Sequence, residues 1–277
     1  MNCNSSRLSN RLLAGRVLSR SAGSIPPLST EKIMHSTLLS RRAIKKLGQL
    51  EVRLHSAYGS PQAVLGNKRD PLNEAIYILL SFQTSVSRSR CVWRRLRSTF
   101  HSWRQVELAT EAHLAATIRG GGLHRQKART IKRLLSSVRK AFGKLSLRSL
   151  RKMSDEVAES LLTHLPGLSW KGARCVLLYS LDRKAFPVDV NTFRILRRIG
   201  IIEPDSVYRR KALHNTLQDA VPPVRRKRFH VNLVVHGQQT CLPHNPGCTS
   251  CPVRSICNMT GVSSTADSPG DKPPNRL

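Results

Sequence analysis

Four cysteines close together near the C-terminal end constrain the fold of this chain more than any other feature. They are separated by six, two and five residues: Cys241, Cys248, Cys251 and Cys257. The segment is rich in residues that favour an irregular loop, namely Pro243, Pro246, Gly247 and Pro252. A loop that gathers four thiolates predicts a bound metal. A [4Fe–4S] cluster accepts four cysteines at uneven spacing, whereas zinc sites usually show two close pairs. The spacing alone leaves iron–sulfur and zinc both open.

The remaining cysteines are scattered, at Cys3, Cys91 and Cys175. A secreted disulfide scaffold would be shorter and would spread its cysteines more evenly. The distribution therefore indicates a reducing compartment and a single metal or cluster site.

The charge of the chain indicates its partner. Lysine and arginine number 47 against 16 aspartates and glutamates, which gives a formal net charge of +31. A protein this basic attracts polyanions, chiefly nucleic acids and anionic membrane surfaces. The longest apolar runs, such as residues 75–80, fall far short of the roughly 18–20 residues that a membrane-spanning helix needs. We therefore expect nucleic acid to be the partner.

Apolar residues recur at three- and four-residue spacings through most of the chain, which predicts successive helices. One should begin at Asp70, which can cap it, with Pro71 in the first turn. Others are expected over residues 37–57, 124–142, 156–164, 171–181, 190–199 and 207–220. No alternating strand pattern is found, so the predicted fold class is all-α.

Both ends of the chain differ in composition from the middle. The first 30 residues hold four arginines and seven serines but no acid. We interpret residues 1–36 as a disordered basic arm, as the product of an over-long gene start with the true start at Met34, or as a targeting segment. Residues 259–277 are rich in Ser, Pro, Gly and Asp and are predicted to be a disordered tail.

Residues 165–169 predict a tight turn between two helices. The second helix would begin with free N–H groups and a positive dipole, which suit a phosphate. Lys171 lies at this helix start, where the dipole and the nearby Arg174 should both lower its pKa, as a nucleophilic amine requires. A phosphate contact is the simpler role for a lysine in so basic a chain.

Asp189 is an acid within an apolar run, and it follows Lys171 by eighteen residues. A partly buried carboxylate near a lysine can act as a base or stabilise a developing cation. It can also be the N-cap of the following helix, and the two roles are compatible.

In order and separation these segments resemble the endonuclease III branch of the helix–hairpin–helix (HhH-GPD) DNA glycosylases. The matching segments are residues 165–173, 187–189 and the cysteine loop, with 79–84 and 122–128 upstream, so the resemblance covers roughly residues 43–257. It implies two helical domains with a DNA-binding groove between them. One is a six-helix domain over residues 71–183, and the other is an iron–sulfur domain formed by residues 37–70 plus 184–258.

The resemblance also implies roles for single residues. Lys171 would be the nucleophile, Asp189 its carboxylate partner, and the four cysteines the ligands of a [4Fe–4S] cluster. Gln83 would enter the gap left in the duplex by a flipped base. The other implied DNA contacts are Lys127 and the hairpin residues Gly167, Leu168 and Ser169.

The implied activity is that of a base-excision DNA glycosylase with abasic-site (β-elimination) lyase activity. It would remove damaged bases, above all oxidised pyrimidines, from double-stranded DNA through a lysine Schiff base. The partner would be double-stranded DNA with a damaged base or an abasic site, bound by a monomer without a membrane. The protein would be intracellular and located with DNA: in the cytoplasm or nucleoid of a bacterium, or in the nucleus or mitochondrion of a eukaryote.

Three residues depart from the family pattern. Ser169 replaces the second glycine of the hairpin and would be strained if this position needs a positive φ. Val190 and Asn191 replace the usual Thr and His, which indicates a divergent subfamily with its own lesion preference. Two alternatives remain: a monofunctional mismatch or adenine glycosylase, which Lys171 argues against, and a non-catalytic DNA-binding iron–sulfur protein, which would need neither Lys171 nor Asp189.

Overall fold

The structure, a computed structural model, describes residues 39–60 and 66–262. In this part of the chain all regular secondary structure is helical, which confirms the all-α fold class. None of the described helices has the length and apolarity that crossing a membrane requires. The arm predicted for residues 1–36 lies outside the described residues, as do residues 263–277 of the predicted tail. Residues 259–262 are described, and they turn against the fold where the Thr260 N–H donates to Arg198 O at 3.2 Å.

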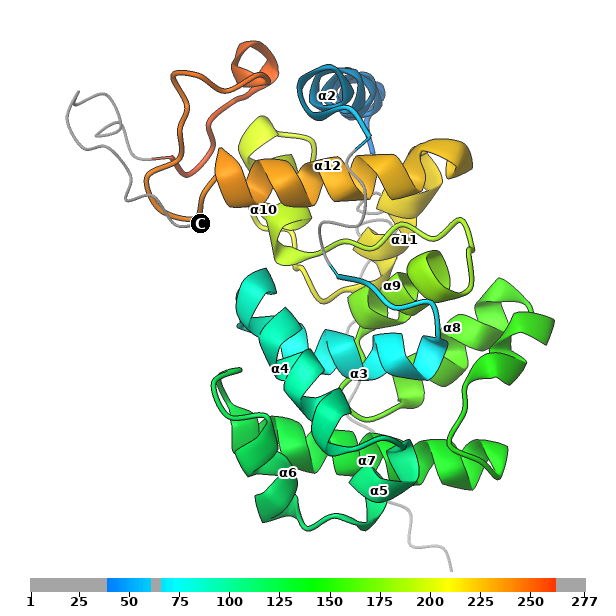
Figure 1. Ribbon diagram of the computed structural model, residues 1–277. Helices are drawn as coiled ribbons and strands as arrows, with labels where there is room; N and C mark the ends of the chain where they lie inside the picture. The colour runs from blue at the N-terminus through cyan, green and yellow to red at the C-terminus, as the bar shows by residue number, and fades with distance from the viewer. Residues whose placement is uncertain (1–38, 61–65, 263–277) are drawn as a thin grey trace, which may run out of the picture. The chain divides into compact units, whose positions relative to one another are not determined.

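Figure 1 shows the helices in chain order. They are α2 (Arg41–Tyr58), α3 (Pro71–Ser81), α4 (Val86–Thr99), α5 (Trp103–Leu108), α6 (Glu111–Thr117), α7 (His124–Phe142), η1 (Arg148–Lys152), α8 (Asp155–His164), α9 (Trp170–Ser180), α10 (Val190–Ile199), α11 (Lys211–Ala220), η2 (Pro223–Arg225), α12 (Arg226–Gln239) and η3 (Arg254–Ile256). Helix α7 and helix α10 have the bounds that the periodicity predicts. Helix α11 begins later than predicted, because residues 207–210 form a turn closed by the Arg210 N–H on Val207 O at 3.1 Å.

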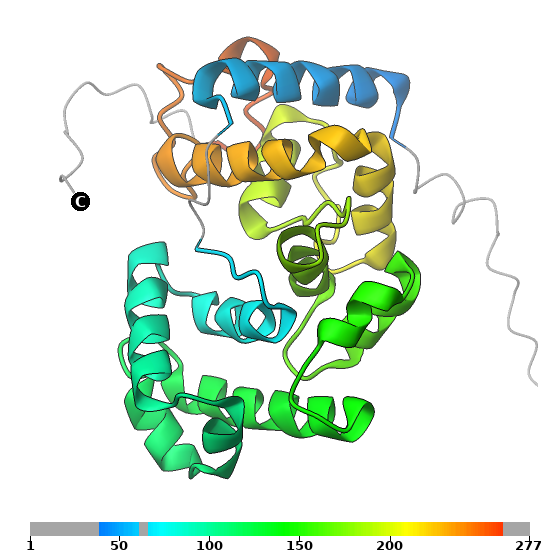
Figure 2. The same ribbon diagram turned by 45° about the vertical axis from the view of Figure 1, so that its right-hand side comes forward.

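Two hydrophobic cores divide the described helices. The first core is built from buried residues between Leu72 and Ala185, contributed by helices α3 to α9. The second core combines residues 43–54 of α2 with residues from Phe186 to Val253. Helix α12 lies beside α2 and α10 in both views (Figures 1 and 2), and it contacts both. Residues 71–183 are all described and hold seven α-helices, one more than the resemblance implies, because α5 and α6 are separate short helices.

Helix α9 is buried along nearly its whole length and packs against α3 and α8. Its Arg174 is 1% exposed, and its guanidinium binds groups from two other helices. It donates to Glu159 Oε1 of α8 at 2.5 Å, and to His214 O and Asn215 Oδ1 of α11 at 2.6 and 2.5 Å. A buried charge needs such partners, so α9 is fixed against α8 and α11 together.

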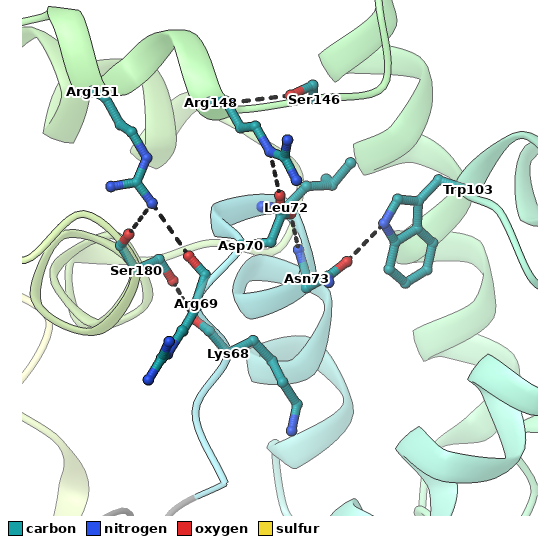
Figure 3. A network of polar contacts seen from close by, with 10 residues as sticks. All are labelled: Lys68, Arg69, Asp70, Leu72, Asn73, Trp103, Ser146, Arg148, Arg151 and Ser180. Carbon is teal, nitrogen blue, oxygen red and sulfur yellow. Dashed lines mark hydrogen bonds and ion pairs between the residues drawn. The ribbon is translucent and has the colours of Figure 1, made fainter.

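A polar network fixes the start of α3 against the end of α9 (Figure 3). Asp70 caps α3 as predicted, accepting from the N–H groups of Leu72 and Asn73 at 3.1 Å each, and also accepts from Arg148 Nε at 3.0 Å. Ser180, the last residue of α9, donates from Oγ to Lys68 O at 2.6 Å. Arg151 donates to Ser180 O at 2.8 Å. These hydrogen bonds therefore fix the position of α3 relative to α9.

Candidate active site

The hairpin between α8 and α9 is shaped by one glycine. Gly167 has a φ of +82°, and a Cβ at this position would lie 2.4 Å from Thr130 Cγ2, so only glycine fits. Ser169 has a φ of −100°, so replacing the family's second glycine brings no left-handed strain. Gly167 and Ser169 are exposed, whereas the Leu168 side chain is buried in the first core. The Leu168 N–H donates to Leu165 O at 3.1 Å, so the hairpin offers a ligand mainly Gly167 and Ser169.

Helix α9 begins directly after this hairpin, and its N-terminus has no side-chain cap. Helix α8, in contrast, is capped by Ser154, whose Oγ accepts from the Val157 N–H at 3.4 Å. The first N–H groups and the positive dipole of α9 therefore face the hairpin without a side-chain acceptor, as an anion site requires. Lys171 is the second residue of α9 and is half-buried.

The pKa of Lys171 is raised, so the expectation of a lowered pKa is wrong. Burial lowers it, but Cys175, Asp189, Tyr208 and Glu74 raise it by more. Burial also raises the pKa of Cys175 and of Tyr208 to about 12, so both are neutral near pH 7. Asp189 is thus the main charged neighbour that holds the ammonium. Arg174 is not among the groups that shift the pKa of Lys171, and it forms an ion pair with Glu159.

Asp189 is 9% exposed and is the N-cap of α10, which confirms the structural role considered for it. Oδ1 accepts from the Thr192 N–H at 2.7 Å, and Oδ2 accepts from Asn191 Nδ2 at 3.0 Å. Burial alone raises the pKa of this carboxyl, but His230, Lys171 and the Thr192 N–H lower it below its ordinary value. Asp189 is therefore a carboxylate at neutral pH.

Sequence reasoning missed several neighbours of this pair. Cys175 lies one turn after Lys171 on α9, a spacing that could have identified it. Glu74 is a buried acid within an apolar helix and accepts from Asn67 Nδ2 and from the Lys68 N–H, both at 2.6 Å. His230 of α12 is 1% exposed, and burial lowers its pKa to about 4. Nothing local marks His230, which reaches the site only through tertiary packing.

Asn191, one of the departures from the family pattern, connects the site to the cysteine loop. Its Oδ1 accepts from Arg194 Nη2 at 2.9 Å while its Nδ2 donates to Asp189. Arg194 also donates from Nε to Cys241 O at 3.0 Å. Val190, the other departure in this segment, is 61% exposed.

The remaining predicted contacts are Gln83, in the loop between α3 and α4, and Lys127, in α7. Gln83, between α3 and α4, is exposed with a φ of +50°, and Leu123, just before α7, is 50% exposed with a φ of +49°. Lys127 is only 6% exposed, and its ammonium donates to acceptors within the protein. This placement differs from the direct DNA contact that the resemblance implies. Leu123 was not singled out from the sequence, although the glycines before it mark the loop.

The four cysteines line one pocket together with Arg198 and His236. Arg198 Nη1 donates to Cys241 Sγ at 3.3 Å, and the Met259 N–H donates to Cys257 Sγ at 3.3 Å. Hydrogen bonds of this kind suit thiolates that bind a cluster. Among the described residues, no three Cys, His, Asp or Glu side chains are arranged to hold a single metal ion. The four thiols that the sequence predicts as ligands lie around one pocket.

Comparisons with known proteins cover the hairpin and the residues around it. A family model described as "HhH-GPD superfamily base excision DNA repair protein" matches residues 76–223, just over half of the chain. The matched range includes Gln83, Lys127, the hairpin, Lys171 and Asp189, and ends before the cysteine loop.

Similar proteins and structures agree with this match. A putative DNA glycosylase of Arabidopsis thaliana is 31% identical over 167 residues, which are 60% of this chain and 56% of that protein. The DNA glycosylase/AP lyase ROS1 of the same plant is 27% identical over 180 residues, 59% of this chain but 13% of that protein. The chain thus spans only part of the length of these relatives. A solved endonuclease III in non-covalent complex with DNA has the same fold, with a TM-score of 0.68 at 22% identity over 78% of this chain and 95% of that one.

Proposed function

Because the chain belongs to the HhH-GPD superfamily of base excision DNA repair proteins, we propose that it is a DNA glycosylase with abasic-site lyase activity. The family match confirms the resemblance predicted from the sequence. The observation that carries the proposal is Lys171, which lies in the first turn of α9 just beyond the Gly167 hairpin and whose pKa is raised by Asp189 among other groups. The substrate is double-stranded DNA with a damaged base, above all an oxidised pyrimidine, or with an abasic site.

The reaction begins when the damaged nucleotide leaves the base stack, at a cost of a few kcal/mol that a lesion reduces. The neutral Lys171 amine attacks C1′ of the sugar, and the bond from C1′ to the base breaks with its electron pair going to the base. The sugar ring opens and leaves a Schiff base between Lys171 Nζ and C1′. Removal of a proton from C2′ then expels the 3′-phosphate and nicks the strand.

The protonation states define the task of each side chain. Lys171 is an ammonium in the free protein and has to give up one proton before it attacks. The departing base needs a proton, so the two transfers balance. Asp189 has a lowered pKa and is a weak base, and its negative charge stabilises the cation that develops on the sugar.

The hairpin and the uncapped start of α9 would bind the phosphate backbone beside the flipped nucleotide. The two hydrophobic cores support a division into a helical domain over residues 71–183 and a second domain from residues 37–70 plus 184–258. The protein acts as a monomer on intracellular DNA.

The cysteine loop would hold a [4Fe–4S] cluster through Cys241, Cys248, Cys251 and Cys257. When bound, the cluster supplies a rigid structural centre for the loop rather than chemistry at the sugar. We expect the purified protein to contain iron and acid-labile sulfide in equal amounts, and Cys251→Ala to lower both. Cys91→Ala, at an exposed cysteine outside the loop, is the matched control and should leave both unchanged. Stoichiometric zinc without iron would contradict the assignment.

Base release and strand nicking distinguish the proposal from its alternatives. On duplexes that each carry one oxidised pyrimidine, the protein should release the base and nick the strand at matching rates. Base release without nicking would indicate a monofunctional glycosylase. Tight binding to abasic DNA without any turnover would indicate a non-catalytic DNA-binding protein.

A further inference from the structure

Two exposed residues on neighbouring loops have left-handed backbone conformations. Gln83 has a φ of +50° and Leu123 a φ of +49°. For residues other than glycine this conformation costs on the order of 1 kcal/mol or more, so it persists only where the surroundings hold it. The two loops are adjacent, since a Cβ on Gly122 would lie 3.6 Å from Gln83 O. Both loops therefore need a group that fixes their backbone conformation.

The buried ammonium of Lys127 donates hydrogen bonds to both loops. Lys127 Nζ donates to Leu80 O at 2.8 Å and Thr84 Oγ1 at 2.7 Å, on either side of Gln83, and to Gly121 O at 2.5 Å, two residues before Leu123. An ammonium has three donors and no acceptor, so all of its hydrogen-bonding capacity is satisfied here. Thr84 Oγ1 also donates to Gly121 O, which joins the two loops directly.

A second cation fixes the other end of the loop before Leu123. Arg95 of α4 donates to the carbonyl oxygens of Thr117 and Arg119. The loop is thus attached at one end by Arg95 and at the other by Lys127. Burial lowers the pKa of Lys127 to about 8, which shows the cost of placing a cation there. The three acceptors offset that cost.

We propose that Lys127 is a positioning residue that fixes Gln83 and Leu123 relative to one another, so that both side chains enter the duplex where a nucleotide has been extruded. This inference rests on the proposed function. Lys127 itself does not touch DNA. Its effect is confined to recognition of the gap and does not extend to non-specific binding of phosphate.

The test compares two duplexes of one sequence, one intact and one with a tetrahydrofuran abasic analogue opposite 2-aminopurine. Wild-type protein should prefer the analogue duplex and raise the 2-aminopurine fluorescence by unstacking that base. Lys127→Met should reduce the preference by about tenfold or more, equivalent to roughly 1.4 kcal/mol. The fluorescence rise should be lost, and the affinity for the intact duplex should stay unchanged.

Lys132→Met is the matched control. Lys132 is also on α7, and its ammonium also donates to two carbonyl oxygens, Glu107 O at 2.6 Å and Ala109 O, away from both loops. It should keep the preference and the fluorescence rise. If Lys127→Met does not fold, Thr84→Val, which removes one acceptor and the direct link between the loops, should show the same loss to a smaller degree.

The outcomes distinguish a failure of the proposed function from a failure of the positioning role of Lys127. Wild-type protein without any preference for the analogue duplex would contradict the proposed function itself. Wild-type preference that Lys127→Met and Thr84→Val both retain would overturn the role of Lys127. An equal loss in Lys132→Met would also overturn it, because the effect would then be one of general stability.

Discussion

At the scale of single residues, the electrostatic effect of Asp189 on Lys171 changes the expected chemistry. The helix dipole and Arg174 predict a lowered pKa for Lys171. That pKa is raised although burial acts to lower it, Asp189 is among the groups that raise it, and Arg174 forms an ion pair with Glu159. The free protein therefore holds Lys171 as an ammonium, which the proposed reaction has to deprotonate. In the proposed reaction, an extruded nucleotide that displaces water would alter the field around Lys171 and lower its pKa.

Asp189→Asn tests the charge of this carboxylate without removing its structural role. Asparagine is as good an N-cap as aspartate, so the Thr192 N–H keeps an acceptor and the fold should survive. The nicking rate should fall by roughly 10²–10⁴-fold, the usual contribution of such a group. Because the carboxylate raises the pKa of Lys171, its removal lowers that pKa, and the rising limb of the pH–rate profile should move to lower pH.

Asp70→Asn is the matched control for this prediction. Asp70 is likewise an N-cap that accepts from two backbone N–H groups, but it begins α3 and does not act on Lys171. Its replacement should leave the nicking rate and the pH profile unchanged. An unchanged rate in Asp189→Asn would remove Asp189 from the reaction.

At the scale of elements, the backbone conformation of the hairpin requires glycine at position 167 but not at position 169. Gly167→Ala should destabilise the protein by about 2–4 kcal/mol, because it adds left-handed strain and places a Cβ against Thr130 and Leu79. Ser169→Gly should change the free energy of unfolding by no more than about 1 kcal/mol, since Ser169 has an ordinary φ. Urea denaturation measures both. Equal effects of the two substitutions would contradict this view of the hairpin.

Local sequence signals predicted seven of the eleven α-helices in the described residues but not α4, α5, α6 or α12. Helices α7 and α10 have their predicted bounds, and Asp70 caps α3. The signals failed where tertiary structure decides. The pKa of Lys171 depends on Asp189, which no local pattern places beside it, and His230 reaches the site across more than forty residues of sequence. The resemblance implies a DNA contact for Lys127. Its burial could not be predicted, because it depends on two loops that meet only in the folded chain.

At the scale of the whole molecule, the charge divides into internal and external parts. The few acids serve largely as internal partners: Glu51 pairs with Arg225 and Arg228, and Glu107 with Arg104 and Arg139. Buried cations such as Arg174 and Lys127 hold segments together rather than facing a ligand. The net charge of +31 therefore indicates a polyanion without identifying the residues that touch it.

The central claim is that Lys171 forms a covalent bond with the sugar. Borohydride reduction in the presence of abasic duplex DNA tests it most directly, because only a Schiff base is converted into a stable protein–DNA adduct. The account predicts an adduct for wild-type protein, with the DNA on the peptide that contains Lys171, and none for Lys171→Ala. An adduct of normal yield with Lys171→Ala, or one attached through a different lysine, would contradict it.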